Sequence, residues 1–310
     1  MNFLRLIRLP NLLLLGIMML SFRYGFLKQH DIYLALADWQ YILLIFATIF
    51  IAAAGYIIND VFDRDTDMIN KPKKVIVGIY ISENTAYNLY VVFNVIGVGI
   101  GFYLSNVIKK PSFAAVFILI AALLYIYASS LKYITVLKNI IIASILAMSV
   151  LIIGIFDLYP ATYSGNQKEM ATLFNVLTDY AIFAFIINFI REIVKDLQDV
   201  KGDNSEGIKT IPVVLGISKT TKIISLFTII PVLMLSWYIQ SYLMENNLYF
   251  ITIYALIFII APLLFFIVKC WNVKSEKDFA FLSNILKIII FFGIISVVLL
   301  TYNIKLNVGG

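Results

Sequence analysis

The chain alternates long apolar blocks with short polar segments, and most blocks are long enough to cross a membrane as a helix. About 20 mostly apolar residues span the hydrocarbon core of a bilayer. Nine blocks meet or approach this length, and the sixth is the shortest. They lie at 9–27, 41–58, 87–106, 113–130, 139–157, 177–190, 223–243, 249–268 and 281–302. The pattern predicts an all-α integral membrane protein, a single domain over residues 1–310, with nine transmembrane helices in a bundle.

The composition supports this prediction. Of the 310 residues, 62% are apolar and only 14% are charged, whereas a soluble domain has about 25% charged residues. A soluble protein could not bury so much apolar surface, and an outer-membrane barrel would alternate apolar and polar positions. The single cysteine, Cys270, excludes an intramolecular disulfide, and the single histidine, His30, argues against a histidine-based metal site.

The distribution of basic residues predicts the orientation. With the N-terminus in the cytoplasm, most of the 24 lysines and arginines flank the spans on the cytoplasmic side, as the positive-inside rule requires. An odd number of spans then places the C-terminus on the opposite side. We expect a multi-pass protein of the cell's inner (plasma) membrane. Because the basic residues are dispersed between the spans, the net charge of +6 reflects topology and not nucleic-acid binding.

Half of the 18 acidic residues lie in two short segments, which follow the second and sixth spans. In each segment three aspartates stand at positions i, i+3 and i+7, on one face of a helix. They are Asp60, Asp63 and Asp67, and Asp196, Asp199 and Asp203. Like charges at this spacing repel, so the alternatives are a solvated loop or a cation site. Mg²⁺ prefers oxygen ligands, including phosphate, and two such columns predict two Mg²⁺ ions around a diphosphate.

Basic side chains near the acidic segments could neutralise the oxygens of that diphosphate. They are Arg64, Lys71, Lys132, Arg191 and Lys195. A diphosphate beside nine apolar helices indicates an amphiphilic substrate such as a prenyl diphosphate. The alternative of another class is an ion-coupled transporter, which would place acids in the middle of spans or in unwound helices. Here the acids lie at span ends, which favours prenyl transfer.

Several segments carry a family resemblance. NDVFDRDTD (59–67) resembles the N-D-x-x-D-x-x-x-D motif of the UbiA-type intramembrane prenyltransferases, and DLQDVKGD (196–203) resembles their second motif, D-x-x-D-x-x-x-D. Similar stretches are RLPN (8–11), INKPKKVIVGIYIS (69–82), YASSLK (127–132) and GIKTIPVVLG (207–216), with Lys71 where the family usually has Arg. The resemblance covers about residues 5–220, and the last three spans match by hydropathy only.

The resemblance implies a cytoplasm-facing cavity capped by two Asp-rich loops, 59–85 and 191–222. It implies that Mg²⁺ is held by Asn59, Asp60, Asp63, Asp67, Asp196, Asp199 and Asp203, the aspartates being the catalytic residues. Through the stretches RLPN and YASSLK it adds Arg8, Asn11 and Tyr127 to the basic residues expected to bind the diphosphate.

Within the family, the second motif is most similar to the branch that makes digeranylgeranylglyceryl phosphate. That branch passes a geranylgeranyl group from its diphosphate to the hydroxyl of geranylgeranylglyceryl phosphate, forming an ether. Prenylation of an aromatic acceptor such as 4-hydroxybenzoate is the alternative. A hydroxyl acceptor would benefit from a general base, for which Glu192 and Asp199 are candidates.

Overall fold

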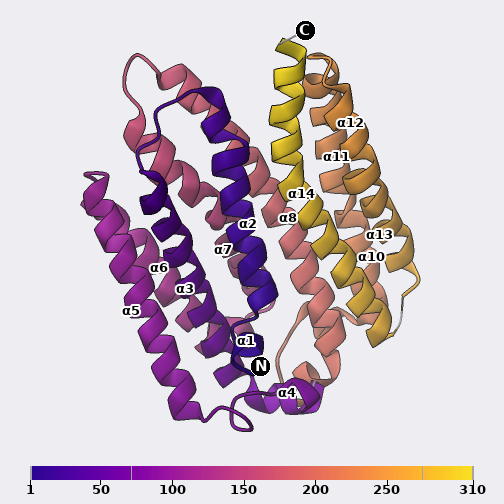
Figure 1. Ribbon diagram of the computed structural model, residues 1–310. Coiled ribbons are helices and arrows are strands. Elements are labelled where there is room, and N and C mark those ends of the chain that lie inside the picture. Colours follow the sequence, from indigo (N-terminus) through magenta and orange to yellow (C-terminus); the bar gives the residue numbers. More distant parts are fainter. Residues whose placement is uncertain (1, 71, 274, 309–310) are drawn as a thin grey trace.

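The computed structural model describes residues 2–70, 72–273 and 275–308, and these residues form a helical bundle (Figure 1). Its helices are α1 (Asn2–Leu6), α2 (Leu9–Gly25), α3 (Asp38–Phe62), α4 (Arg64–Asn70), α5 (Glu83–Val107), α6 (Ala114–Ser129), α7 (Leu137–Ile153), α8 (Gln167–Ser205), α9 (Ile211–Leu215), α10 (Ile217–Phe227), α11 (Ile229–Tyr238), α12 (Tyr249–Ala255), α13 (Ala261–Trp271) and α14 (Glu276–Val308). The described ranges contain no β-strand, only an isolated bridge between Val77 and Ile81.

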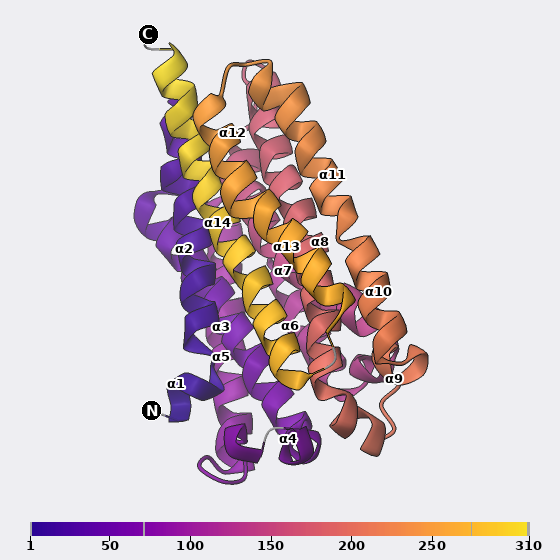
Figure 2. The same ribbon diagram turned by 90° about the vertical axis from the view of Figure 1, so that its right-hand side faces the viewer.

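Nine helical stretches within the described residues are long and apolar enough to cross a membrane, which confirms the number predicted from the sequence. Two of them combine two labelled helices, since α10 continues into α11 and α12 into α13. In a third, α7 extends through a π-helical turn. The two ends of the chain lie at opposite ends of the bundle (Figures 1 and 2). That placement agrees with an odd number of spans.

The sixth span is much longer than predicted. Instead of ending near residue 190, α8 runs for 39 residues, about 58 Å at 1.5 Å per residue. The continuation is amphipathic, and its apolar residues Ile193, Val194 and Leu197 are buried in a cluster with Phe266 and Leu282 of α13 and α14. A hydropathy average misses such a helix because its charged face lowers the mean.

The two Asp-rich segments are therefore more helical than the predicted loops. In the predicted loop 191–222, the first part up to Ser205 belongs to α8, and Gly202 lies inside this helix. The short helix α9 and the start of α10 follow. Of the predicted loop 59–85, the first acidic segment belongs to the end of α3 and to α4, which meet at Asp63. The aspartates of the second motif lie on one continuous helix, as their i, i+3, i+7 spacing predicts, whereas those of the first are divided between α3 and α4.

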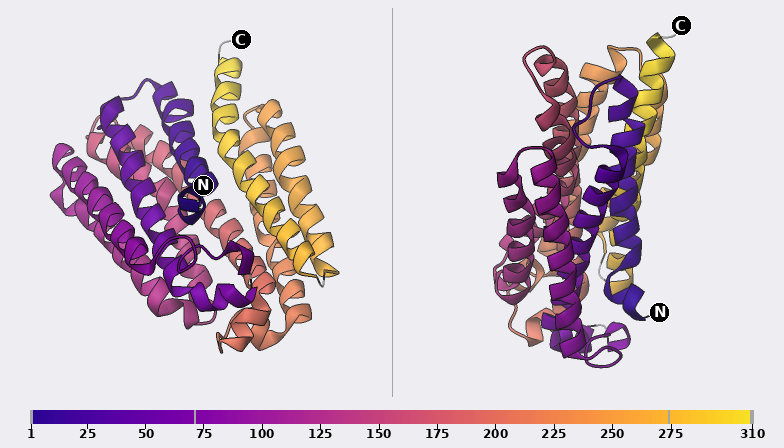
Figure 3. Two further views of the ribbon diagram at one scale, coloured as in Figure 1. Left: turned by 60° about the horizontal axis from the view of Figure 1, so that its bottom comes forward. Right: turned by 60° about the vertical axis from the view of Figure 1, so that its left-hand side comes forward.

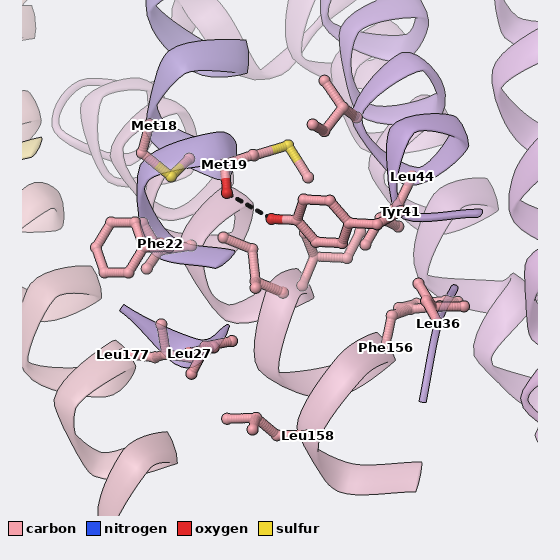
Figure 4. Close-up of a cluster of buried hydrophobic side chains, with 14 of the residues drawn as sticks. Met18, Met19, Phe22, Leu27, Leu36, Tyr41, Leu44, Phe156, Leu158 and Leu177 are labelled. Atoms are coloured by element: carbon pink, nitrogen blue, oxygen red, sulfur yellow. Dashed lines mark hydrogen bonds between the residues drawn. The ribbon is translucent and has the colours of Figure 1, made fainter. Parts of the chain in front are cut away.

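A buried cluster holds α2, α3 and α7 together toward the end of the bundle away from α4 (Figures 1 and 4). Met19, Phe22, Tyr41 and Phe156 pack in it, and the hydroxyl of Tyr41 donates a hydrogen bond to the carbonyl of Met19 at 2.6 Å. This packing fixes the spacing of three helices whose other ends carry polar side chains.

Candidate active site

The two acidic motifs meet at the end of the bundle where the N-terminus lies. Asn59 and Asp60 are in the last turn of α3, Asp63 ends that helix, and Asp67 lies on α4. The chain turns at Asp63, and α4 crosses the end of the bundle to pack against α8, which carries the second motif (Figure 3, left). Segments far apart in the sequence are thereby brought to one site.

Arg8 approaches the first motif from the N-terminal segment. Its guanidinium lies 2.9 Å from the Asp60 carboxylate and 4.8 Å from the centre of the Tyr56 ring. Burial alone would lower the pKa of Arg8, but the Asp60 carboxylate raises it above its usual value, so Arg8 stays cationic. Arg8 has a left-handed backbone (φ 51°) between α1 and α2, a conformation uncommon outside glycine. The turn aims the side chain at α3.

Asp63 receives two donors. The ammonium of Lys132 lies 2.7 Å from one of its carboxylate oxygens and also donates to the carbonyl of Phe62 at 2.9 Å. The amide of Asn59 donates to the other carboxylate oxygen. Lys132 is buried, whereas the side chain of Asp63 keeps 27% of its surface exposed. The carboxylate is therefore neutralised yet accessible from outside.

In the second motif, both carboxylate oxygens of Asp196 are engaged by the start of α7. The ammonium of Lys138 lies 2.7 Å from Oδ1, and the amide of Asn139 donates to Oδ2 at 2.9 Å. Asp203 is buried, and its Oδ2 has no hydrogen-bond partner within the described part of the chain. Glu192, one turn before Asp196, pairs with Lys195 at 2.6 Å.

Tyr127 lies between the motifs. It is close enough to Asp63, Asp196 and Glu192, and to Arg8, for their charges to act on its hydroxyl. The charges of Glu192 and Arg8 likewise act on the ammonium of Lys195. Charged and polar side chains from α3, α6, α8 and the N-terminal segment are therefore near one another, and we call this group the polar centre.

The remaining predicted diphosphate ligands divide into two groups. Arg191 and Asn11 line a cleft next to the centre, and the Nε atom of Arg191 is buried without a hydrogen-bond partner in the described ranges. Arg64, in contrast, pairs with Asp65 at 3.0 Å and with Glu83 of α5, so two carboxylates already engage its guanidinium. Lys71 lies outside the described residues.

The cleft runs from this polar centre into the bundle between α2, α3, α7, α8 and α14. Its polar end is lined by Asn11, Tyr56, Asn188, Arg191 and Lys287. Its deeper part is apolar, with Leu15, Met18, Phe22, Val150, Phe183 and Ile290 among the lining residues. A cleft with one charged end and one apolar end fits an amphiphilic molecule.

Five residues of the site were not predicted: Tyr56 and Asn188 at the polar end of the cleft, and Lys138, Asn139 and Lys287. Lys138 and Lys287 were counted as determinants of membrane topology, and Asn139 stands at the start of an apolar span. In the structure, Lys287 donates to Asn11 at 2.9 Å, so α14 contributes a cation to the polar end of the cleft. Asn139 is buried in the first turn of α7. A buried amide in an apolar helix was the available signal, because such a group needs a polar partner.

The donors present fit Mg²⁺. They are carboxylate and amide oxygens, the ligands that this ion prefers, and the buried Asp203 Oδ2 is a free acceptor among them. Within the described residues no three acidic, histidine or cysteine side chains converge closely enough to enclose a metal ion. Mg²⁺ usually takes only one or two carboxylates and completes its shell with phosphates and water, so a diphosphate would supply the missing ligands.

Comparison with known proteins agrees with this arrangement. The model of the "UbiA prenyltransferase family" matches residues 13–302. Digeranylgeranylglyceryl phosphate synthase of Saccharolobus solfataricus is 32% identical to the chain over 232 residues, which are 74% of this chain and 74% of that protein.

Solved structures share the whole fold. A structure of digeranylgeranylglyceryl phosphate synthase in membranes aligns over 98% of both chains with a TM-score of 0.64 and 20% identity. A UbiA homologue from Archaeoglobus fulgidus bound to DMAPP and Mg²⁺ aligns over 96% of this chain and 99% of its own, with a TM-score of 0.57 and 17% identity. At these identities the likeness establishes the fold alone.

Proposed function

Because the chain belongs to the UbiA prenyltransferase family, and is a membrane-embedded prenyltransferase, we propose that it transfers a geranylgeranyl group to the hydroxyl of geranylgeranylglyceryl phosphate. The observation that carries this proposal is the cleft, which joins a cationic end beside two acidic motifs to an apolar interior. A prenyl diphosphate has the same division into charged head and apolar tail. The relative from Saccharolobus solfataricus is named digeranylgeranylglyceryl phosphate synthase, and this name supports geranylgeranylglyceryl phosphate as the acceptor.

The diphosphate head binds between the motifs. We expect Arg8, Lys132 and Arg191 to pair with its oxygens, because Arg8 and Lys132 contact the first motif and Arg191 lines the polar end of the cleft. Asn59, Asp60, Asp63 and Asp67, together with Asp196, Asp199 and Asp203, are the residues that would hold Mg²⁺. When bound, Mg²⁺ neutralises the charge that develops on the leaving diphosphate. The Mg²⁺ bound with DMAPP in the Archaeoglobus fulgidus homologue supports Mg²⁺ as the ion.

The transfer breaks the bond between C1 of the prenyl group and the diphosphate oxygen, and the electron pair leaves with the diphosphate. The acceptor hydroxyl oxygen forms the new bond to C1, and its proton passes to a carboxylate. Glu192 and Asp199 are the two candidates for this base. The apolar wall around Phe183 and Ile290 excludes water from the electrophilic carbon.

We further propose that the acidic end of the bundle faces the cytoplasm of a cell whose inner membrane contains the protein. The excess of lysine and arginine on this side supports that orientation. Both substrates then reach the cleft with their phosphates at the cytoplasmic surface and their chains in the bilayer.

The test is product formation by the purified protein in liposomes with Mg²⁺ and radiolabelled geranylgeranyl diphosphate. Geranylgeranylglyceryl phosphate and 4-hydroxybenzoate are offered in separate reactions. We expect an ether lipid from the first acceptor only. Product from 4-hydroxybenzoate alone would retain prenyl transfer and overturn the proposed acceptor. An absence of product and of Mg²⁺-dependent diphosphate binding would overturn the whole assignment.

A further inference from the structure

Lys287 is a cation inside a membrane-spanning helix. It lies within the last span, Glu276–Asn307, and lines the polar end of the cleft. Its ammonium donates to the side-chain oxygen of Asn11, a neutral group, at 2.9 Å. Among the described residues, the charge that acts on this ammonium is that of Arg191, which is itself a cation. A charged side chain inside a span is costly and commonly marks the path of a substrate or ion.

Arg191 is the second cation at this end of the cleft. Its Nε atom is buried without a hydrogen-bond partner in the described part of the chain. Its guanidinium lies 3.9 Å from Glu192, beyond hydrogen-bond distance, and Glu192 is engaged by Lys195 at 2.6 Å. The described residues that line the cleft include no carboxylate. Two cations therefore border a space whose lining supplies no counter-charge, and an anionic group of a ligand would supply it.

A series of contacts separates Lys287 from the first acidic motif. The amide of Asn11, whose oxygen accepts from Lys287, lies 3.5 Å from the hydroxyl of Tyr56. The guanidinium of Arg8 lies 4.8 Å from the centre of the Tyr56 ring and 2.9 Å from Asp60. Arg8 thus faces the motif, and Lys287 stands at the other end of the series. An anion bound between the motifs meets Arg8, which leaves Lys287 for a second anionic group.

The proposed reaction brings two phosphate-bearing lipids into one cleft. The acceptor, a glyceryl phosphate, carries a phosphomonoester with close to two negative charges at neutral pH. Its phosphate and its hydroxyl are attached to neighbouring or next-neighbouring carbons of glycerol. Holding the phosphate therefore also places the hydroxyl that attacks the prenyl group, which is how binding orients a reactant. An ammonium has three donors, and Lys287 uses one of them for Asn11.

We propose that Lys287, with Arg191 beside it, forms a second anion site that binds the phosphate of the acceptor lipid. Asn11 holds the ammonium of Lys287 in place. Arg191 borders both phosphate sites, because its charge acts on Lys287 and also on Lys195 of the polar centre. The inference rests on the proposed function for the identity of the acceptor, but the phosphate site itself is tested without turnover.

The first experiment measures equilibrium binding of two radiolabelled lipids, geranylgeranylglyceryl phosphate and its dephosphorylated form, to the purified protein in EDTA. No prenyl diphosphate is present. We expect the wild type to bind the phosphorylated lipid about 10-fold or more tightly than the neutral one, the scale of a hydrogen bond to a charged group. Lys287→Met should lose most of this preference while its affinity for the neutral lipid is kept, which also shows that the variant is folded.

Two further variants serve as controls. Lys287→Arg keeps the charge and should keep most of the preference. Lys277→Met removes an exposed lysine from the same helix and should leave the preference unchanged. An unaltered preference in Lys287→Met, an equal loss of affinity for both lipids, or a wild type without preference would overturn the proposal. Inorganic phosphate is added as a competitor, and displacement of the lipid by an equal concentration would make this a site for free phosphate instead.

The second experiment separates the two substrates by steady-state kinetics. In Lys287→Met, KM for geranylgeranylglyceryl phosphate should rise by about 10-fold or more, whereas KM for geranylgeranyl diphosphate should stay within about twofold. The reverse pattern would assign Lys287 to the diphosphate and overturn the proposal. Failure of the proposed function has a different signature, because the wild type would then prefer the phosphorylated lipid in the binding experiment yet form no ether from it.

Discussion

Lys132 lies on the connection between α6 and α7, and Lys138 lies in the first turn of α7, yet each pairs with a different acidic motif. Lys132 is 2.7 Å from Asp63 of the first motif, and Lys138 is 2.7 Å from Asp196 of the second. Each carboxylate also receives an asparagine amide, from Asn59 and Asn139 respectively. One short stretch of the chain therefore supplies a cation to an aspartate of each motif.

Asp63 is expected to be essential for turnover, and Asp65 is its matched control. Asp63→Ala should lower kcat by at least about 100-fold, the scale of losing a transition-state contact or metal support, while insertion and folding persist. Asp65 lies on the opposite face with 75% of its side chain exposed, so Asp65→Asn should change kcat by less than about twofold. The rates are measured by product formation under saturating Mg²⁺. A similar loss in both variants would contradict a specific role of Asp63.

The second motif is tested by Asp199→Ala. Asp199 is one helical turn from Asp196 and Asp203 on α8, and we expect its removal to abolish turnover while the protein still folds. Turnover is assayed as for Asp63, and folding is followed by thermal unfolding. Retained activity in both Asp63→Ala and Asp199→Ala would refute a site built from two motifs.

Removal of divalent metal is expected to stop the reaction reversibly. The carboxylates and the diphosphate are all anionic, so the leaving group is not neutralised without a divalent cation. Product formation is measured in EDTA and again after Mg²⁺ is restored in excess. Full activity in a thoroughly chelated preparation would contradict the dependence of the reaction on Mg²⁺.

Arg8 is expected to bind the diphosphate. Arg8→Met removes a guanidinium that pairs with Asp60 at 2.9 Å, and we expect KM for the prenyl diphosphate to rise by about 10-fold or more, from the loss of a charge-assisted contact. Arg5, an exposed residue of α1, provides the control Arg5→Gln. An unchanged KM in Arg8→Met would remove Arg8 from the binding site.

A stability prediction concerns the far end of the bundle. Arg23 and Asp157 are buried there, with their side chains 3.4 Å apart. Arg23→Gln should destabilise the protein by about 3 kcal/mol or more, because Asp157 remains buried without its cation. The loss of stability is measured by thermal unfolding of the single variant Arg23→Gln and of the double variant that also carries Asp157→Asn. If adding Asp157→Asn restores no stability, the pair is not the cause.

The spans and the acidic motifs were predictable because each depends on local sequence. Hydropathy identifies a span, and the i, i+3, i+7 spacing identifies a carboxylate face. The length of α8 was missed since Ile193, Val194 and Leu197 gain their burial from α13 and α14, which no local average contains. Lys138 was missed for a similar reason. Its partner Asp196 is far along the chain, so the pair forms only when α7 packs against α8.

The shape of the cleft indicates a substitution that would change the length of the prenyl chain that the protein accepts. Gly293 of α14 lines the cleft and is buried, yet a Cβ added there would meet no atom within 4 Å. The side chain of Gly293→Leu would therefore extend into the cleft. We expect kcat/KM for geranylgeranyl diphosphate to fall by about 10-fold or more relative to geranyl diphosphate, because the longer tail needs the filled space.

Gly99 provides the matched control for this substitution. It also lies in a long membrane helix with open space around an added Cβ, but it is on the exposed face of α5. Both substitutions replace a helical glycine with leucine, so both gain the same helix propensity. Gly99→Leu should leave the preference for chain length unchanged. An equal shift in the two variants, measured with both diphosphates in competition, would mean that the prenyl chain does not occupy the cleft beside Gly293.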